Sequence, residues 1–384
     1  MGILGKHPGV GGQRGQREHS FATVSEAPIV MSNGNAPVGD PPRRLLIVGS
    51  TPGPYGGLEA FMITVAKAAQ AWPEFEVRLC FKLVKGAEAQ DSLRAAFAKT
   101  GIPTAVVRSG SRELLRQIRW AHVLHVQNVP PDVIAAGRLL GKRVYCTIHN
   151  WRRTEFPLHY VLWGISWQFA HRRWYNSEYV MRSWEGSRPR ASSEAFPTVS
   201  DLPTGIVDPT ERRGFVFVGR WIANKGIEEL IAAYASAKLD RDAWPLTIVG
   251  DGERRGVVER LLSELDVPEV QLPGFVSADE KNDFIRRAKW LVAPANTRED
   301  MGLTPIEARS VGVPAIVTRD GGLPEAGGPA ALLAEPGDVR SLAAGLEEAA
   351  AMPEHEYRRR ATLAKSSLTG YLRPMSFYRE AFAR

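Results

Sequence analysis

Residues 290–325 read WLVAPANTREDMGLTPIEARSVGVPAIVTRDGGLPE. The apolar run WLVAPA (290–295) predicts a buried strand, and PAIVTRD (314–320) predicts a second one. The segment between them predicts a loop that leads into a helix. Strand, helix and strand in immediate succession are typical of a parallel sheet whose faces are covered by helices.

Two glutamates, Glu299 and Glu307, lie between these strands, with seven residues separating them. Glu307 has a purely structural interpretation. Thr304 is a good N-cap residue, Pro305 is suited to the first helical position, and a glutamate three residues after the cap closes a capping box. The helix N-terminus predicted here would also attract phosphate through its free N–H groups and its dipole.

Similar apolar runs occur on both sides of this segment. The first series is RRLLIVGS (43–50), VRLCFKLV (77–84), TAVVRS (104–109), HVLHVQN (122–128), RVYCTIHN (143–150) and RRWYNSE (172–178). The second series is GFVFVGR (214–220), LTIVGDG (246–252), VQLPGF (270–275), WLVAPA (290–295) and PAIVTRD (314–320). Runs this uniformly apolar indicate strands buried on both faces, as in parallel sheets. Segments with helical periodicity alternate with them, so the sequence predicts two doubly wound α/β domains.

The domain boundaries follow from the composition of the chain. Residues 1–41 are polar and rich in glycine, which predicts a flexible tail. We expect one Rossmann-like domain over 42–205 and a second over 206–370, with the polar segment 198–213 as the hinge. Ligands bind beyond the carboxyl ends of the strands in such folds, so two facing domains would place a ligand in a central cleft.

Composition excludes several other classes of protein. The 384 residues carry a net charge of +7, and 44% of them are hydrophobic, which excludes a wholly disordered chain. Two cysteines, Cys80 and Cys146, are too few for a disulfide scaffold and are expected to be buried thiols. No apolar run approaches the about 20 residues that span a bilayer. No nucleic-acid-binding motif accompanies the basic charge.

The paired glutamates and their surroundings resemble the retaining GT-B glycosyltransferases of the broad glycosyltransferase family 4 (group 1). The hallmark E-x-F-G…E-A…G-x-P followed by G-G-x-P-E corresponds here to EDMG (299–302), EA (307–308), GVP (312–314) and GGLPE (321–325). Met301 replaces the usual aromatic residue. The resemblance covers roughly residues 42–384, densely in the second domain and weakly in the first. It also implies that the C-terminal helix, 371–384, packs back on the first domain.

Other segments match this family in order. Gly219-Arg220…Lys225-Gly226 is similar to its donor-phosphate clamp, and IVGDG (248–252), with Gly250, and LPGFV (272–276) are similar to two further strand ends. Nearer the N-terminus, Gly56-Gly57 and His149-Asn150 occupy the places of its glycine pair and of a strand-end histidine. TGIV (204–207) is a weaker match to the family's N-G-V-D.

The resemblance implies a role for each of these residues in binding a nucleotide-sugar donor. Arg220 and Lys225 would stabilise the charge that grows on the departing diphosphate. Glu307 would bind the ribose hydroxyls and Glu299 the donor sugar, without acting as a nucleophile. His149 would contact the donor sugar near the reaction centre. The remaining donor-binding positions are Gly56, Gly57, Gly219, Gly250, Phe275, Val276, Met301, Gly302 and Leu303.

We therefore expect a metal-independent, cytoplasmic enzyme that needs no cofactor. It would move a hexose-type sugar from a UDP-, GDP- or ADP-sugar to a glycan, lipid-linked or small-molecule acceptor, with retention of configuration, in polysaccharide or glycoconjugate synthesis. Two alternatives stay open. One is a nucleotide-sugar epimerase or a synthase on the same fold, and the other is a catalytically idle subunit that binds the nucleotide-sugar.

Three further patterns favour structural interpretations. Asp240-Arg241-Asp242 spells the D-x-D of metal-dependent glycosyltransferases, but it follows an amphipathic helix, which indicates a solvated helix end. His122 and His125 are three residues apart on a strand and face opposite sides, so they do not form a metal pair. Residues 149–184 contain five of the ten tryptophans among several arginines, for which core packing is the first interpretation. The alternative is an interfacial surface that meets lipid headgroups or a lipid-linked acceptor, which would place the protein peripherally at the inner face of the membrane.

Overall fold

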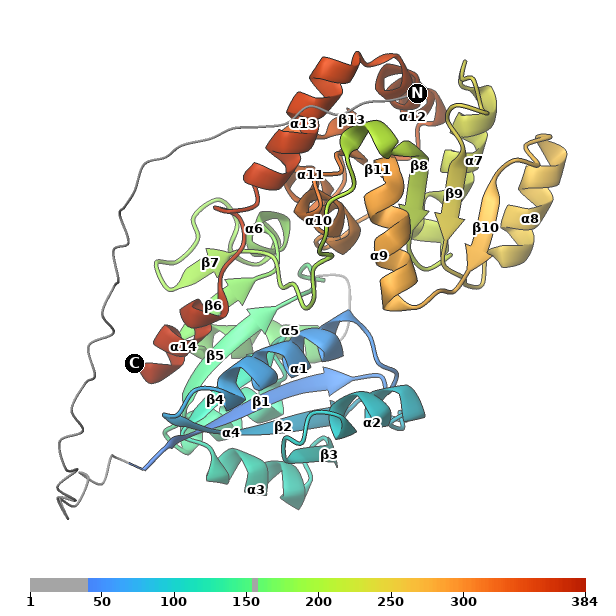
Figure 1. Cartoon of the computed structure of the whole chain (residues 1–384). Coiled ribbons are helices and arrows are strands. Elements are labelled where there is room, and N and C mark those ends of the chain that lie inside the picture. Colours follow the sequence, from blue (N-terminus) through green and yellow to red (C-terminus); the bar gives the residue numbers. More distant parts are fainter. Residues whose placement is uncertain (1–40, 154–157) are drawn as a thin grey trace, which may run out of the picture. The chain divides into compact units, whose positions relative to one another are not determined.

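The computed structural model describes residues 41–153 and 158–384 (Figure 1). It confirms the predicted α/β class with two sheets, in which every strand pairing is parallel. The seven-stranded sheet has the order β3-β2-β1-β4-β5-β6-β7, and the six-stranded sheet has the order β10-β9-β8-β11-β12-β13. Both orders reverse beside the first strand, as in doubly wound folds.

The strands of the first sheet are β1 (Arg43–Thr51), β2 (Phe75–Leu83), β3 (Thr104–Arg108), β4 (Val123–Gln127), β5 (Arg143–Ile148), β6 (Arg172–Tyr175) and β7 (Ser193–Ala195). The helices that follow these strands are α1 (Gly57–Gln70), α2 (Asp91–Ala98), α3 (Arg112–Trp120), α4 (Pro131–Leu139), α5 (Leu158–Ser166), the 3₁₀ turn η1 (Trp167–Phe169) and α6 (Glu178–Glu185). Strands β1 and β4 are central and buried on both faces, so the charged residues Arg43 and Arg44 occur only at the partly exposed start of β1.

The strands of the second sheet are β8 (Arg213–Val218), β9 (Leu246–Val249), β10 (Gln271–Gly274), β11 (Ala288–Ala293), β12 (Ala315–Thr318) and β13 (Leu332–Ala334). The associated helices are α7 (Ile227–Ser236), α8 (Arg255–Glu264), α9 (Ala278–Arg287), α10 (Leu303–Ser310), α11 (Leu323–Gly327), α12 (Val339–Ala351) and α13 (Glu354–Ser366). Single 3₁₀ turns are η2 (Pro209–Glu211), η3 (Ala223–Lys225) and η4 (Gly328–Ala330).

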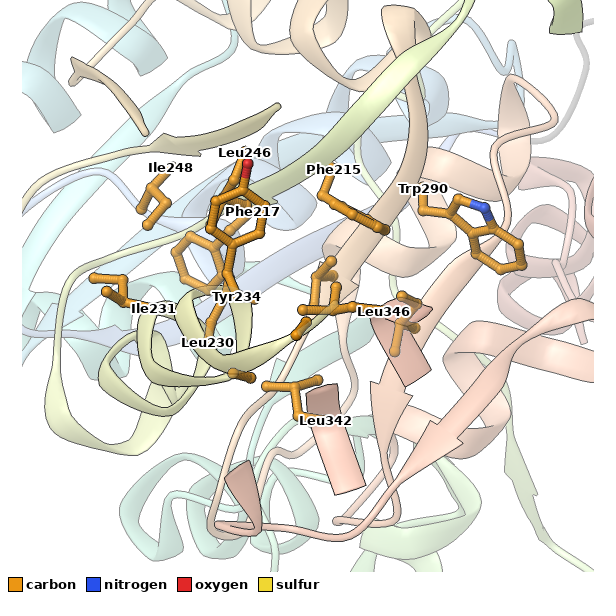
Figure 2. Packing of buried hydrophobic residues seen from close by; sticks show 14 of the residues in the cluster. Phe215, Phe217, Leu230, Ile231, Tyr234, Leu246, Ile248, Trp290, Leu342 and Leu346 are labelled. Carbon is orange, nitrogen blue, oxygen red and sulfur yellow. The ribbon is translucent and has the colours of Figure 1, made fainter. Parts of the chain in front are cut away.

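An apolar core lies on each face of both sheets. In the second sheet, Phe215 and Phe217 of β8 pack with Leu230 and Tyr234 of α7 and with Leu342 of α12 (Figure 2). This packing holds α7 and α12 against one face of the sheet and leaves its carboxyl edge to the connecting loops. The loops that carry the predicted motifs are therefore supported by a rigid layer.

The C-terminal helix α14 (Met375–Ala383) packs against the first sheet. Tyr378 and Phe382 contact the rings of Trp174 and His125, with centroid separations between 5.2 and 5.9 Å. The chain thus returns to the first sheet after completing the second. Two strands, β7 and β13, were not predicted, because three residues are too short a run to show a period.

Candidate functional site

Four neighbouring strands of the six-stranded sheet end in the predicted motifs. Gly219 and Arg220 follow β8, Gly250 follows β9, Phe275 follows β10, and the loop with Glu299 follows β11. Parallel strands place their carboxyl ends on one edge of the sheet, so these four loops meet there. Gly250 has φ +126°, and a Cβ at this position would lie 1.9 Å from the carbonyl oxygen of Gly219. A glycine is therefore required for the β8 and β9 loops to touch.

One pocket at this edge is lined by Arg220, Lys225, Glu299, Gly302 and Leu303, among others. The Lys225 ammonium lies 2.5 Å from a carboxylate oxygen of Glu299, and both side chains remain partly exposed. The backbone N–H of Glu299 donates a 2.7 Å hydrogen bond to the Asp320 carboxylate. This hydrogen bond fixes the loop that carries Glu299. The pocket thus presents two cations and one carboxylate on a supported frame.

Helix α10 begins at this pocket and not where the sequence predicted. Thr304 was predicted to be the N-cap, but the helix starts at Leu303 and its N-cap is Gly302, which has φ +89°. The left-handed conformation of Gly302 lets the chain turn into the helix earlier, and a Cβ there would lie 2.8 Å from Leu323. No side chain caps this helix, and Gly302, Leu303 and Thr304 line the pocket. Its N-terminal N–H groups are suited to an anion.

Glu307 does not close a capping box, because the helix begins too early for that spacing. Its side chain is buried, and one carboxylate oxygen forms an ion pair with the Lys281 ammonium of α9 at 2.6 Å. The other carboxylate oxygen is buried without a hydrogen-bond partner. Burial raises the pKa of Glu307, and the Lys281 charge opposes that shift. A buried acceptor left open in this way is a candidate ligand contact.

A second pocket of about 370 Å³ adjoins the first, since Gly219 and Arg220 line both. Its other walls include Gly250, Phe275 and Val276. The Phe275 side chain is 87% exposed, which is unusual for a phenylalanine and leaves its ring free to stack on a ligand.

His149 follows β5 of the other sheet and is held by neighbouring strand ends. Its Nε2 lies 2.9 Å from the Gln127 side-chain oxygen, which can only accept, so this nitrogen carries the proton. Its backbone N–H donates to the side chain of Asn128. Burial lowers the pKa of His149 to about 4, so the ring is neutral at pH 7. The sequence did not single out Gln127 or Asn128.

Several contacts connect His149 to the loop of the second sheet. The Thr198 hydroxyl lies 3.3 Å from His149 Nδ1 and 3.9 Å from the Met301 sulfur. Next to them, the Asp300 carboxylate accepts from the Trp151 N–H at 2.8 Å and from the Asn150 amide at 3.2 Å. The structure therefore brings His149 and Asn150 beside residues 299–302.

Asp300 and Glu325 are contact residues that the sequence did not mark as functional. Burial raises the pKa of Asp300 to about 6, and its hydrogen bonds from Trp151 and Asn150 oppose that shift. The Glu325 carboxylate accepts from the backbone N–H groups of Glu178 and Tyr179 at the start of α6. Both acids belong to the quoted EDMG and GGLPE motifs, so their position within those motifs was an available signal.

Gly56 is the N-cap of α1, and Gly57 is the first residue of this helix. The Gly56 N–H donates to the carboxylate of Glu59, which is buried, so an acidic side chain already occupies part of this helix N-terminus. Across residues 41–153 and 158–384, no hydrogen bond joins Gly56 or Gly57 to the other predicted site residues. Asp240 and Asp242 lie in an exposed turn after α7, and Asp240 accepts from the Ala243 N–H.

Comparison with protein families matches residues 204–365 to a model described as glycosyl transferases group 1. An uncharacterized glycosyltransferase of Methanocaldococcus jannaschii is 35% identical over 122 residues, which are 32% of this chain and 30% of that protein. A GDP-mannose-dependent alpha-(1-6)-phosphatidylinositol monomannoside mannosyltransferase of Mycobacterium tuberculosis is 30% identical over 156 residues, which are 36% of this chain and 40% of that protein. These matches span less than half of either relative.

Solved structures match over most of the chain at low sequence identity. A glycosyltransferase from Rickettsia africae has a TM-score of 0.71 and 16% identity, covering 89% of this chain and 98% of that one. Anabaena HepE in complex with UDP-glucose has a TM-score of 0.70 and 16% identity, covering 88% and 98%. The two-sheet architecture is thus the GT-B fold. The sequence match and the fold together identify residues 204–365 as a domain of the glycosyl transferases group 1 family.

Proposed function

We propose that this protein is a retaining, metal-independent glycosyltransferase that moves a hexose-type sugar from a nucleotide-sugar to a glycan, lipid-linked or small-molecule acceptor. The observation that carries the proposal is the pocket where Arg220, Lys225 and the uncapped start of α10 converge beside Glu299. Its location within the matched family domain supports the assignment.

A diphosphate leaving group suits this pocket chemically. When the bond between the sugar and the phosphate oxygen breaks, negative charge develops on the phosphate. Arg220, Lys225 and the N–H groups at the start of α10 would offset this charge, which is the role that a metal ion has in other transferases. Lys225 is paired with Glu299, so a bound phosphate would share its ammonium and free the carboxylate for the sugar hydroxyls.

The nucleoside would occupy the second pocket. The unpartnered oxygen of Glu307 can accept from a ribose hydroxyl, and Phe275 can stack on the base. The name of the mycobacterial relative specifies GDP-mannose, whereas the structural neighbour contains UDP-glucose. Both relatives therefore support a nucleotide-sugar, and the base stays open among uracil, guanine and adenine.

His149 would contact the donor sugar as a neutral imidazole that Gln127 orients. The acceptor oxygen forms the new bond on the face from which the phosphate leaves. The acceptor proton passes to the departing phosphate, so no carboxylate nucleophile is required. Glu299, already engaged with Lys225, is assigned to binding the sugar.

The test begins with melting-temperature shifts of the whole chain against UDP-, GDP- and ADP-sugars. The sugar that stabilises the protein is then incubated with and without acceptors, and the anomeric configuration of the product is followed by NMR. Transfer with retention supports the proposal. Conversion of the donor alone would identify an epimerase, and binding without conversion under any acceptor would identify an idle subunit. In the same assays Lys225→Ala should weaken donor binding or turnover by at least about tenfold. Lys238→Ala, which changes an exposed lysine of the same domain, is the matched control.

A further inference from the structure

An exposed apolar stripe runs along α5 and η1. Val161, Leu162, Ile165 and Phe169 are 56%, 43%, 49% and 55% exposed. The helical positions of the first three fall within about 100° of one another, so they share one face. Gly164, which points away from this face, is buried, and so are Ser166 and Trp167 where α5 meets η1. Helix α5 thus has an apolar side toward solvent, where an ordinary surface helix has polar residues.

The end of α4 extends this apolar stripe. Leu139 is 88% exposed and Leu140 is 38% exposed, and α4 packs against both α5 and η1. Among the described residues, twelve large apolar side chains are exposed, and six of them lie in these three elements or, for Leu140, directly after α4. Such a concentration marks an interaction surface. We call these six residues, Leu139, Leu140, Val161, Leu162, Ile165 and Phe169, the α5 patch.

The chain around the α5 patch is strongly basic. Residues 133–177 contain seven Lys or Arg and a single acidic residue, and Asp132 and Glu178 flank this range. Arg173 is buried, so six of the basic side chains are at least partly exposed. Arg138 contacts His171, which directly follows η1, so a guanidinium lies beside the apolar residues. Arg143, which is exposed, is the first residue of β5, the strand that follows α4. Basic side chains next to exposed apolar side chains are complementary to a partner that has an anionic surface above an apolar interior.

We propose that the α5 patch docks on the surface of a bilayer that contains anionic lipids. Its apolar residues would enter the boundary between headgroups and acyl chains, and Arg138, Arg143 and Arg172 would contact the lipid phosphates. A hollow lined by Trp151, Trp163 and Trp184 lies between α5 and the loop bonded to Asp300. Docking would therefore bring the membrane close to the candidate active site. This inference concerns location and goes beyond the proposed transfer reaction.

Co-sedimentation of the full chain with vesicles tests the proposal. We expect binding to vesicles of phosphatidylcholine mixed with phosphatidylglycerol, weaker binding to phosphatidylcholine alone, and a loss of binding at high salt. The double variant Val161→Gln/Ile165→Gln should weaken partitioning by at least about tenfold. Ile206→Gln/Leu333→Gln, which changes two exposed apolar residues elsewhere, should leave partitioning unchanged.

A charge series separates the electrostatic contribution. Arg138→Glu/Arg143→Glu should abolish the preference for anionic vesicles, whereas Lys238→Glu/Arg340→Glu, in the six-stranded-sheet domain, should not. The proposal is overturned if the wild type does not bind anionic vesicles or if Val161→Gln/Ile165→Gln binds them like the wild type. It is also overturned if sedimentation shows that the patch joins two copies of the chain without vesicle binding. Sugar transfer to a soluble acceptor should survive in all four variants, so failure of docking leaves the proposed function standing.

Discussion

At the scale of single residues, the candidate site depends on two acid–base pairs with different surroundings. Lys225 and Glu299 are 2.5 Å apart and both remain partly exposed, so either partner can exchange its contact for a ligand. Glu307 is almost fully buried, and Lys281 satisfies one of its two oxygens. The Lys225–Glu299 pair is suited to reversible binding of a charged group. The second is suited to a fixed hydrogen bond.

Lys225→Met should weaken binding of a nucleoside diphosphate by at least tenfold, or about 1.4 kcal/mol, because it removes a charge-assisted contact. Isothermal titration calorimetry measures this loss. Lys238→Met removes an exposed lysine of the same domain and should bind like the wild type. Equal affinity in Lys225→Met and Lys238→Met would exclude Lys225 from the site.

Glu307→Gln should weaken nucleotide binding by at least tenfold while leaving the melting temperature at neutral pH unchanged or higher. Burial raises the pKa of Glu307, so holding it ionised in the folded state costs free energy that a neutral amide does not. Differential scanning calorimetry and a binding titration on the same sample separate the two effects. A lower melting temperature with normal binding would show that Glu307 is only structural.

At the scale of elements, the start of α10 depends on one glycine. Gly302 ends the Glu299 loop in a left-handed conformation and begins the helix at Leu303, which leaves N–H groups toward the pocket. The predicted start at Thr304 with a capping box would have satisfied those N–H groups internally. The site therefore exists because this helix is uncapped.

Gly302→Ala should destabilise the protein by about 1–3 kcal/mol, since alanine is strained at this φ and its Cβ would meet Leu323. Gly256→Ala, in α8 with open space around the added Cβ, should be neutral or stabilising by up to about 1 kcal/mol. Urea unfolding followed by circular dichroism compares the two variants. Similar midpoints for both would refute the requirement for glycine at 302.

At the scale of the whole molecule, the contacts of Asp300 and Glu325 join the two sheets. Asp300 accepts from the loop after β5, and Glu325 accepts from the start of α6. These contacts hold His149 and Glu299 in neighbouring loops. The relative position of these two predicted site residues thus depends on a carboxylate whose pKa lies close to 6.

The stability contributed by Asp300 should depend on pH. Because its folded-state pKa is raised, the contribution is fully present below the ordinary value of about 4 and is lost as pH rises through about 6, by at most about 3 kcal/mol. Asp300→Asn does not titrate. Its melting temperature relative to the wild type should therefore increase between pH 4 and pH 7. A difference that stays constant over this range would contradict the assignment.

Much of the fold could be predicted from the sequence because it rests on local patterns. Eleven apolar runs correspond to strands β1–β6 and β8–β12. Burial on both faces of a parallel strand leaves a continuous apolar run, which is visible without knowledge of the partners. The motifs that end these strands could be placed at one edge for the same reason.

The amino-acid sequence by itself determined the two parallel sheets and the order of the motifs at their carboxyl ends. Only the tertiary structure decided that Gln127 orients His149, that Asp300 meets Trp151, and that the apolar side of α5 faces solvent. The physical reason is the separation along the sequence over which each interaction acts. Periodicity and turn chemistry act between neighbouring residues, whereas these contacts join positions that only the packing of separate elements brings together.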